Sequence, residues 1–258
     1  MYKVLVLYIC TGKYDVFWKG FYDSSEKFFL KNCQKDYFVF TDAECIYQEE
    51  SDNVHKIYQE NLGWPGNTLF RYKIFLTHKD ILLKYDYIFF INANMEFKSV
   101  VDESILPESG LIVVQHPGYY NAERSKLPYD RNPQSMAYIS KNAGKVYVCG
   151  GFNGGTSEAF LMMTETINNN TDKDFSRDIV AKWHDESHIN KYILNHPYHL
   201  LSPSYAYPED SRLPFKCIVM IRDKEKYGGH AFLRNVKESK LNVVARKGKR
   251  LLRLLMGG

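Results

Sequence analysis

The sequence predicts an α/β fold in which helices flank one mixed, mostly parallel sheet. In the first half of the chain, short apolar runs rich in β-forming residues alternate with segments of helical periodicity. This β-α-β-α-β order favours parallel strands, because each helix returns the chain to the same end of the sheet. The 258 residues, 45% of them hydrophobic, are enough for one large core or two small ones.

The elements of the first half follow from this alternation. Residues 3–10 predict a strand rather than a signal peptide, because they have no clear basic region and no small-residue cleavage site. Four phenylalanines recur at roughly helical spacing over 14–31, and Asn67 is a suitable N-cap for the next helix. The predicted order is a strand at 3–10, a helix at 14–31, a short strand at 37–40, a helix at 67–85 and a strand at 87–91.

The second half of the chain is less regular. It contains no repeat, low-complexity segment or linker that would divide it into domains. We therefore expect one domain over residues 1–236, followed by a basic tail at 237–258. The second half combines predicted strands at 111–114 and 217–221, a segment rich in Pro and Tyr at 117–140, a glycine cluster at 150–155 and predicted helices at 156–168 and 183–195.

Positive charge is concentrated at the C-terminus. Residues 237–256 contain seven Lys or Arg side chains and one Glu, in a chain of net charge +4, and four of their leucines lie between 251 and 255. This composition is typical of a segment on a membrane surface, and a solvated basic terminus is the alternative. The rest of the chain gives no indication of nucleic-acid binding.

The cysteines bear on the compartment. There are five, an odd number, and their spacings match neither a zinc site nor a disulfide framework. They therefore favour a reducing, cytoplasmic location, with the tail as the means of peripheral contact with the inner membrane surface.

Two predicted strands end in segments suited to ligand binding. Cys10-Thr11-Gly12-Lys13-Tyr14 follows the first strand, and Asn92-Ala93-Asn94 follows the strand at 87–91. Ligands of open α/β sheets bind outside the carboxyl ends of the strands. We therefore expect a binding site where these two segments meet.

The segment 183–188 reads Trp-His-Asp-Glu-Ser-His, with Asp185 and Glu186 at the start of a predicted helix. The helix dipole there favours the ionised carboxylates. An indole beside two carboxylates suits a sugar, which presents an apolar CH face and a rim of hydroxyls. An ordinary charged helix start with a capping aspartate explains the spacing equally well.

Three further motifs each have two interpretations. The glycines at 150–155 would let the backbone approach a ligand closely, although a plain loop also fits. His116 follows a buried strand and suits a hydrogen bond to a sugar hydroxyl, whereas a lone histidine is more often structural. The basic segment 222–234 suits a diphosphate, and a solvated basic loop is the alternative.

Together these segments resemble glycosyltransferase family 6, which includes the histo-blood-group A and B transferases and α-1,3-galactosyltransferase. The resemblance extends over about residues 2–236 and keeps several long motifs in order. The membrane anchor and stem of the animal members are not found, so we expect a bacterial homologue of catalytic-domain size. The matching motifs are Met95-Glu96-Phe97, His116-Pro117-Gly118, the segments 131–139, 150–155 and 183–192, Leu201-Ser202-Pro203 and Arg234-Asn235.

The resemblance implies a nucleotide-sugar-binding fold of the GT-A type, with a donor-binding first half and an acceptor-binding second half. It implies retaining transfer of Gal or GalNAc from a UDP-sugar to the 3-hydroxyl of a galactoside. The residues that it places at the donor are Tyr8, Ile9, Cys10, Tyr14, Arg71 and Asp185, and those that it places at the acceptor are His116, Pro128, Trp183, Glu186 and Glu209.

Glu186 is the expected catalytic carboxylate. Retention requires either a nucleophile on the sugar face opposite the leaving group or a front-face route through an ion pair. Glu186 suits both, either as that nucleophile or as the group that stabilises the oxocarbenium-like state and orients the acceptor hydroxyl. The sequence leaves both routes open.

The identity of the sugars also follows from the resemblance. Small residues at the positions of Gly150 and Gly151 leave room for an N-acetyl group, so UDP-GalNAc is the expected donor, although Cys149 stands where the family usually has Leu, Met or His. Fucα1,2-galactose is the expected acceptor. An α-1,3-galactosyltransferase is the alternative within the family, and an inactive glycan-binding module is the alternative outside it.

Asn92-Ala93-Asn94 stands where the family has metal-binding aspartates. Amide oxygens are weak, neutral ligands for Mn²⁺ or Mg²⁺ beside a diphosphate. We therefore expect no divalent metal and no other cofactor, and we expect fixed cations to stabilise the departing UDP. The expected contributors are Lys224, Lys226, Arg222 and Arg234, with Asn92, Ala93 and Asn94 beside the ribose or phosphates.

Overall fold

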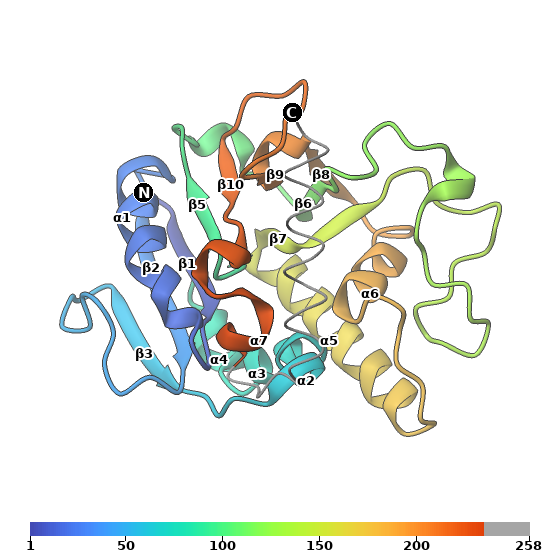
Figure 1. Ribbon diagram of the computed structural model, residues 1–258, viewed down its shortest axis with the longest axis horizontal. Helices are drawn as coiled ribbons and strands as arrows, with labels where there is room; N and C mark the ends of the chain where they lie inside the picture. The colour runs from blue at the N-terminus through green and yellow to red at the C-terminus, as the bar shows by residue number, and fades with distance from the viewer. Residues whose placement is uncertain (235–258) are drawn as a thin grey trace.

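A computed structural model describes residues 1–234 of the chain, and the predicted boundary at 236, Asn235 and the tail at 237–258 lie outside these residues. The centre of the fold is a seven-stranded sheet (Figure 1). Six of its strands point the same way and β7 runs antiparallel to its neighbours β4 and β6. The spatial order is β3 (Val54–Tyr58), β2 (Gln34–Thr41), β1 (Lys3–Ile9), β4 (Tyr87–Ile91), β7 (Val148–Thr156), β6 (Leu111–Gln115) and β8 (Tyr198–Leu201).

A second, three-stranded sheet accompanies the first. Its order is β5 (Met95–Phe97), β10 (Val219–Ile221) and β9 (Tyr207–Pro208), so it joins the segment after β4 to the last part of the described chain. Two short helices, η5 (Lys224–Tyr227) and α7 (Gly229–Leu233), follow β10. The remaining short helices are η1 (Tyr14–Phe17), η2 (Glu103–Ile105), η3 (Arg124–Lys126) and η4 (Pro203–Ala206).

Helices cover both faces of the large sheet because its strands alternate their side chains between two cores. Val4, Val6 and Tyr8 of β1 face the core that contains α1 (Trp18–Phe28) and the small sheet. Leu5 and Leu7 face the opposite core, which contains α3 (Arg71–Leu76), α5 (Ser157–Phe175) and α6 (Asp185–Tyr192). The mixed, mostly parallel α/β architecture is therefore confirmed.

The predicted strands at 3–10, 87–91 and 111–114 are confirmed, and the one at 37–40 is longer than expected. The predicted helix at 14–31 divides into η1 and α1. Five strands escaped prediction: β3, β5, β7, β8 and β9. Of these, β3 and β8 are sheet edges with partly exposed residues and so lack a continuous apolar run.

The prediction of one helix at 67–85 is wrong. The segment forms α2 (Gly63–Leu69), α3 and α4 (Lys79–Leu82) in succession. Asn67 lies inside α2 rather than at its start, and its Oδ1 accepts a hydrogen bond from the Leu62 amide at 2.9 Å. Of the apolar residues at helical spacing, Ile74 and Leu82 are buried, whereas Ile81 is 40% exposed, and the spacing could not show where the helix breaks.

The later helices also differ in length from their predictions. The helix at 156–168 extends to Phe175 as α5, and Thr156 caps its start by accepting from the Ala159 amide at 3.4 Å. The helix at 183–195 is shorter, because α6 begins at Asp185 and ends at Tyr192. The strand at 217–221 is β10, which begins two residues later than expected.

The glycine cluster is a central strand, so the alternative of a plain loop is wrong. Gly154 has a packing reason, since a Cβ there would lie 2.5 Å from Phe89 Cδ1 on β4. Gly155 has a φ of +148°, and a Cβ would lie 2.4 Å from the Gly110 carbonyl oxygen. These two glycines let neighbouring strands approach, and Gly150 and Gly151 remain for the site.

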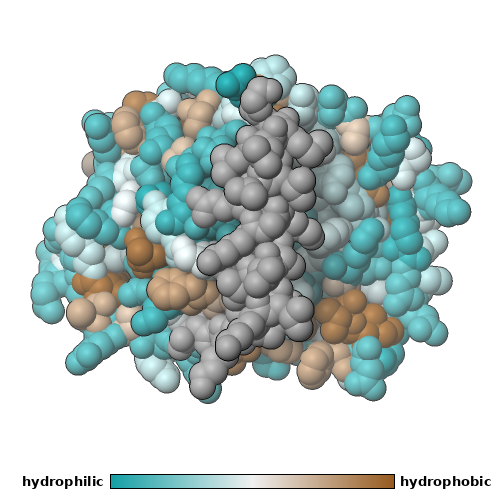
Figure 2. All heavy atoms as spheres, viewed as in Figure 1, coloured by the Kyte–Doolittle hydropathy of each residue, from teal (hydrophilic) through white to brown (hydrophobic). Residues whose placement is uncertain are grey.

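The face of the molecule in Figure 2 is mainly hydrophilic, with hydrophobic side chains in small separate groups. The large side chains are concentrated inside, where Trp18, Tyr8 and Tyr37 are fully buried. Within residues 1–234, no helix combines the length and apolar character needed to cross a membrane.

Candidate functional site

A cavity of about 270 Å³ opens at the carboxyl ends of β1 and β4, beside β7. This is where open α/β sheets bind their ligands. The structure brings most of the predicted site residues together in its wall. They are Ile9, Tyr14, Arg71, Asn92, Ala93, Gly150, Gly151, Trp183, Asp185, Glu186, Lys224 and Arg234.

The turn at 92–94 is held by a chain of hydrogen bonds. Asn92 Nδ2 donates to Asn94 Oδ1 at 3.0 Å, and Asn94 Nδ2 donates to the Arg222 carbonyl at 2.8 Å. The Arg222 amide in turn donates to the Asn94 carbonyl at 2.7 Å. Asn94 is buried outside the cavity wall, so its amide links the end of β4 to the start of the basic segment.

Two other predicted donor residues also lie behind the wall. Tyr8 is fully buried, and its hydroxyl donates to the Ala93 carbonyl at 2.8 Å, which supports the same turn from below. Cys10 is fully buried between β1 and β2, where its amide donates to the Phe40 carbonyl. Burial raises the pKa of the Cys10 thiol to about 12, so it is neutral.

Arg71 contacts three other residues of the cavity wall. Its Nη1 lies 3.3 Å from Asp185 Oδ2 and donates to the Gly150 carbonyl at 3.4 Å, and its guanidinium lies over the Phe90 ring. Arg71 and Asp185 are both buried, and the Arg71 Nε and Asp185 Oδ2 have no hydrogen-bond partner among the described residues. The pair therefore keeps hydrogen-bonding capacity for a polar ligand.

Glu186 is held by two donors. The Tyr147 hydroxyl donates to Oε1 and the Gly150 amide donates to Oε2, each at 2.7 Å. A Cβ on Gly150 would lie 3.2 Å from both Asp185 Oδ2 and Glu186 Cβ. Glycine at this position thus allows β7 to approach the two carboxylates closely.

Helix α6 sets the direction of these carboxylates. His184, just before it, has a φ of +52°, an uncommon value for a residue other than glycine. Asn190 fastens the helix to β7, since Oδ1 accepts from the Val148 amide at 3.0 Å and Nδ2 donates to the Val148 carbonyl at 2.9 Å. Asp185 and Glu186 therefore occupy the first turn of a helix clamped against the strand.

The carboxylates are harder to ionise than ordinary ones. Burial raises the pKa of Asp185 to about 6 and that of Glu186 to about 7, although hydrogen bonds and Arg71 oppose the rise. The helix dipole was expected to favour the ionised forms, but burial favours the neutral forms and has the larger effect on the pKa of both groups. Raised carboxyl pKa values in a cavity are typical of functional sites.

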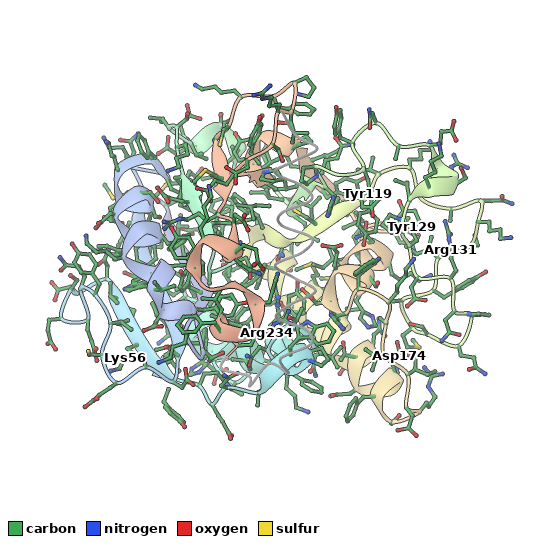
Figure 3. The ribbon with its side chains drawn as sticks, viewed as in Figure 1. Lys56, Tyr119, Tyr129, Arg131, Asp174 and Arg234 are labelled. Carbon is green, nitrogen blue, oxygen red and sulfur yellow. The ribbon has the colours of Figure 1, made fainter. Side chains whose placement is uncertain are left out.

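Three cations from distant parts of the chain face the same cavity: Arg71 of α3, Lys224 of η5 and Arg234 after α7. Figure 3 labels Arg234. Burial, together with the neighbouring Arg234 and Arg71, lowers the pKa of Lys224 to about 8. Such a concentration of positive charge suits an anion. The Lys13 amide donates to the Leu233 carbonyl at 2.9 Å, which anchors α7 beside the end of β1.

The other predicted cations have partners elsewhere. Lys226 Nζ lies 3.0 Å from both Glu209 Oε1 and Asp210 Oδ1, and none of these three residues lines the cavity. Arg222 Nε lies 3.2 Å from Glu96 Oε2, and its guanidinium stacks on Tyr227.

The predicted acceptor residues divide into two groups. Trp183 stands at the cavity rim with 46% of its surface exposed, next to Glu186 in the chain. The His116 ring lies 5.7 Å from the Tyr147 ring, and Tyr147 in turn contacts Glu186. Burial lowers the His116 pKa to about 4. Pro128 lies in the segment between β6 and β7, and neither it nor His116 is in the cavity wall.

Several residues in or beside the cavity wall escaped prediction. Trp64 is 57% exposed, and the Arg234 guanidinium lies 4.8 Å from its ring. Tyr147 is absent from the wall but contacts Glu186 directly. The Trp64 segment could have been inferred from its position seven residues before Arg71, whereas the Tyr147 contact depends on a fold that pairs residues 39 positions apart. The other wall residues that were missed are Thr11, Gly63, Asn67, Thr68 and Phe90.

The donor set around residues 92–94 does not suit a divalent ion. Asn94 uses both amide atoms within the protein, and Asn92 contributes a neutral amide. Over residues 1–234, no group of three or more His, Cys, Asp or Glu side chains is arranged to hold a metal.

Comparison with known proteins places the chain. Residues 3–235 match the family model described as glycosyltransferase family 6. The O-antigen biosynthesis glycosyltransferase WbnI of Escherichia coli is 37% identical over 221 residues, which are 86% of this chain and 94% of that protein.

Animal proteins show the same relationship at lower identity. The histo-blood group ABO system transferase 1 of Rattus norvegicus is 32% identical over 76% of this chain and 58% of its own length. The globoside alpha-1,3-N-acetylgalactosaminyltransferase 1 of Homo sapiens is 28% identical over 81% of this chain and 61% of its own length. The chain belongs to glycosyltransferase family 6, and its mixed α/β fold is of the GT-A type.

Proposed function

We propose that this glycosyltransferase moves GalNAc from UDP-GalNAc, with retention, in α-1,3 linkage to the galactose of a Fucα1,2-Gal acceptor, without a divalent metal. The observation that carries the proposal is one cavity that combines Glu186, Asp185 and three cations at the strand ends. A nucleotide-sugar donor supplies a diphosphate for the cations and a sugar ring for the carboxylates. The glycan acceptor then approaches from the side of Trp183.

The retaining step is assigned to Glu186. Its two hydrogen-bond donors favour the ionised form, so it acts as an anion toward the developing positive charge on the sugar. Both routes to retention, the covalent and the front-face one, require that anion beside the anomeric carbon. Asp185 and Arg71 hold the polar groups of the donor sugar.

The choice of GalNAc is supported by the glycine pair. A Cβ on Gly151 would point at Met95 Cε, 3.2 Å away, and at Asn92 Cβ, 3.5 Å away. Asn92 lines the cavity, so the missing methyl leaves space beside the 92–94 turn. One of the relatives, the human globoside alpha-1,3-N-acetylgalactosaminyltransferase 1, is named for transfer of this sugar, which agrees with the choice.

Metal independence is supported by the distribution of charged side chains around the cavity. The end of β4 offers amides, and Arg71, Lys224 and Arg234 offer fixed positive charges. Cations placed before the reaction begins stabilise the diphosphate as it leaves, the same effect that a metal provides.

Peripheral contact with the inner membrane surface is proposed for the tail at 237–258.

A galactosyltransferase using UDP-Gal is the second candidate. It is favoured by Cys149, which stands beside Gly150 in place of the Leu, Met or His usual in the family. An inactive glycan-binding module is disfavoured, because the hydrogen-bonded Glu186 serves no purpose in binding alone.

A matrix of donors and acceptors, run with and without EDTA, tests the proposal. UDP-GalNAc and UDP-Gal are each offered with Fucα1,2-Gal and with unfucosylated galactose, and products are measured by mass spectrometry. We expect the highest kcat/KM for UDP-GalNAc with Fucα1,2-Gal, unchanged by chelator. A preference for UDP-Gal would overturn the donor assignment, and activity lost in EDTA but restored by Mn²⁺ would overturn metal independence.

A further inference from the structure

Tyr147 contacts the reactive carboxylate from outside the cavity. It precedes β7, its side chain is almost fully buried, and its hydroxyl donates to Glu186 Oε1 at 2.7 Å. Throughout residues 1–234, this is the one hydrogen bond that the Glu186 carboxylate receives from a side chain, since its other donor is the Gly150 backbone amide. The contact fixes one oxygen of the carboxylate and leaves the orientation of the group dependent on Tyr147.

The Tyr147 ring is itself held by aromatic neighbours. The rings of Tyr119, Tyr129 and His116 lie 5.4, 5.5 and 5.7 Å away. Figure 3 shows Tyr119 and Tyr129 on the irregular segment between β6 and β7. The Tyr129 hydroxyl donates to the Val146 carbonyl at 2.6 Å, next to Tyr147 in the chain. Such packing restricts the Tyr147 ring, so its hydroxyl presents a fixed donor to Glu186.

We propose that Tyr147 is a positioning residue, whose hydroxyl aims the Glu186 carboxylate at the reacting carbon and keeps it in the ionised form. The proposal deepens the proposed function and rests on it for the assignment of Glu186 as the catalytic carboxylate. Tyr147 itself does not line the cavity and so does not touch the sugar.

The charged and titratable groups around Glu186 show how far its ionised form depends on Tyr147. Burial and the neighbouring Asp185 raise the Glu186 pKa, and the hydrogen bonds from Tyr147 and Gly150, with Arg71, lower it. The Cys149 thiol, whose pKa burial raises to about 12, is neutral. Burial and Glu186 hold the Tyr147 pKa far above its usual range, so the phenol remains a donor across the working pH range.

Removing the Tyr147 hydroxyl therefore has a defined signature. In Tyr147→Phe the Glu186 pKa rises, and the acid limb of the kcat profile moves to higher pH by about one unit, as loss of one charge-assisted hydrogen bond requires. We expect kcat at pH 7 to fall about five-fold, with most of the loss recovered at pH 9 and KM for the donor sugar unchanged within about two-fold. A residue that only filled space would lower kcat equally at every pH.

Tyr129→Phe is the matched control, because it removes another buried hydroxyl from the same aromatic group but one bonded to Val146. Its acid limb should coincide with that of the unaltered enzyme. If Tyr147→Phe does not fold, as judged by calorimetric UDP binding, 3-fluorotyrosine at position 147 keeps the ring and supplies a stronger donor. That substitution should move the acid limb to lower pH.

A measurement without turnover separates this inference from the proposed function. The Glu186 carboxyl pKa is read from ¹³C NMR of labelled protein, assigned by the signal lost in Glu186→Gln. If the enzyme transfers no sugar from either UDP donor, the proposed function fails, and the NMR titration still decides the inference. An unchanged carboxyl pKa in Tyr147→Phe, or an acid limb that coincides with that of the unaltered enzyme, would overturn it.

Discussion

At the scale of single residues, Glu186 shows a conflict between stability and chemistry. The first turn of a helix and two hydrogen bonds favour its anion, but burial outweighs them and raises its pKa to about 7 from an ordinary value of 4.5. The folded protein therefore holds this carboxylate at a cost in stability. A destabilising carboxylate in the cavity, rather than in the core, is expected where the anion takes part in the reaction.

The pH dependence of activity follows from two of these residues. Glu186 must be ionised, so activity should fall as pH drops below about 7. Lys224 must be protonated to hold the diphosphate, so donor binding should weaken as pH rises above about 8. We expect a bell-shaped profile of kcat/KM with limbs near these values. A flat profile between pH 5.5 and 9 would contradict both assignments.

Glu186→Gln should separate catalysis from stability. We expect kcat to fall roughly 10³-fold, with the UDP dissociation constant unchanged within about three-fold by calorimetry. Because the folded pKa is raised, the native state binds its proton more tightly than the unfolded chain, and the free energy of unfolding falls as pH rises from about 4.5 to 7.

The amide variant removes this cost, so its melting temperature should exceed that of the parent protein by a few degrees at pH 8, where the cost is fully present, for a gain of about 1–2 kcal/mol. At pH 4 the two proteins should melt together. A lower melting temperature for Glu186→Gln at pH 8 would show that the buried charge does not destabilise the folded protein.

At the scale of elements, the joint between α6 and β7 determines the site. Asn190 bonds both the amide and the carbonyl of Val148, and its Nδ2 also donates to the Glu186 carbonyl at 2.8 Å. The helix thus cannot slide along the strand without breaking buried hydrogen bonds. The carboxylates of its first turn keep their distance from Gly150 for this reason.

Asn190→Leu tests the joint. The substitution leaves the Val148 amide and carbonyl buried without partners, so we expect the free energy of unfolding to fall by about 2–4 kcal/mol. Asn169→Leu, on the exposed surface of α5, should change it by less than about 0.5 kcal/mol. Urea unfolding measures both, and equal stability of the two variants would refute the role of Asn190.

The same scale shows why prediction succeeded for strands and failed at one helix. Buried central strands are long apolar runs, so 87–91 was recognisable from its composition. The interruptions between α2, α3 and α4 leave no mark in the sequence pattern, because the buried side chains of α3 and α4 still face one core. The glycines of β7 are read correctly only when Phe89 and Gly110 are known as neighbours.

At the scale of the whole molecule, the fold gathers positive charge that the chain disperses. Arg71, Lys224 and Arg234 come from three elements, and α7 reaches the end of β1 through the hydrogen bond between Lys13 and Leu233. Lys226 is two residues from Lys224, yet it pairs with Glu209 and Asp210 outside the cavity. Sequence position therefore could not distinguish the two lysines.

Paired substitutions of these lysines test that distinction. Lys224→Met should weaken UDP binding about ten-fold and reduce its dependence on salt, because one phosphate-binding charge is lost. Lys226→Met should change the dissociation constant by less than about two-fold, since its charge is already compensated. Calorimetry at low and high ionic strength compares them, and similar losses in the two variants would contradict the assignment.

The sequence by itself determined the α/β class, the family and the chemical types of the site, because apolar periodicity and ordered motifs are local properties of a chain. It placed Asp185 and Glu186 at a helix start and amides at the end of a strand. The tertiary structure alone decided which cations share the cavity, that Asn94 supports the 92–94 turn, and that Tyr147 holds Glu186. These depend on long-range contacts and on burial, which set the charge state of a group and which no local pattern contains.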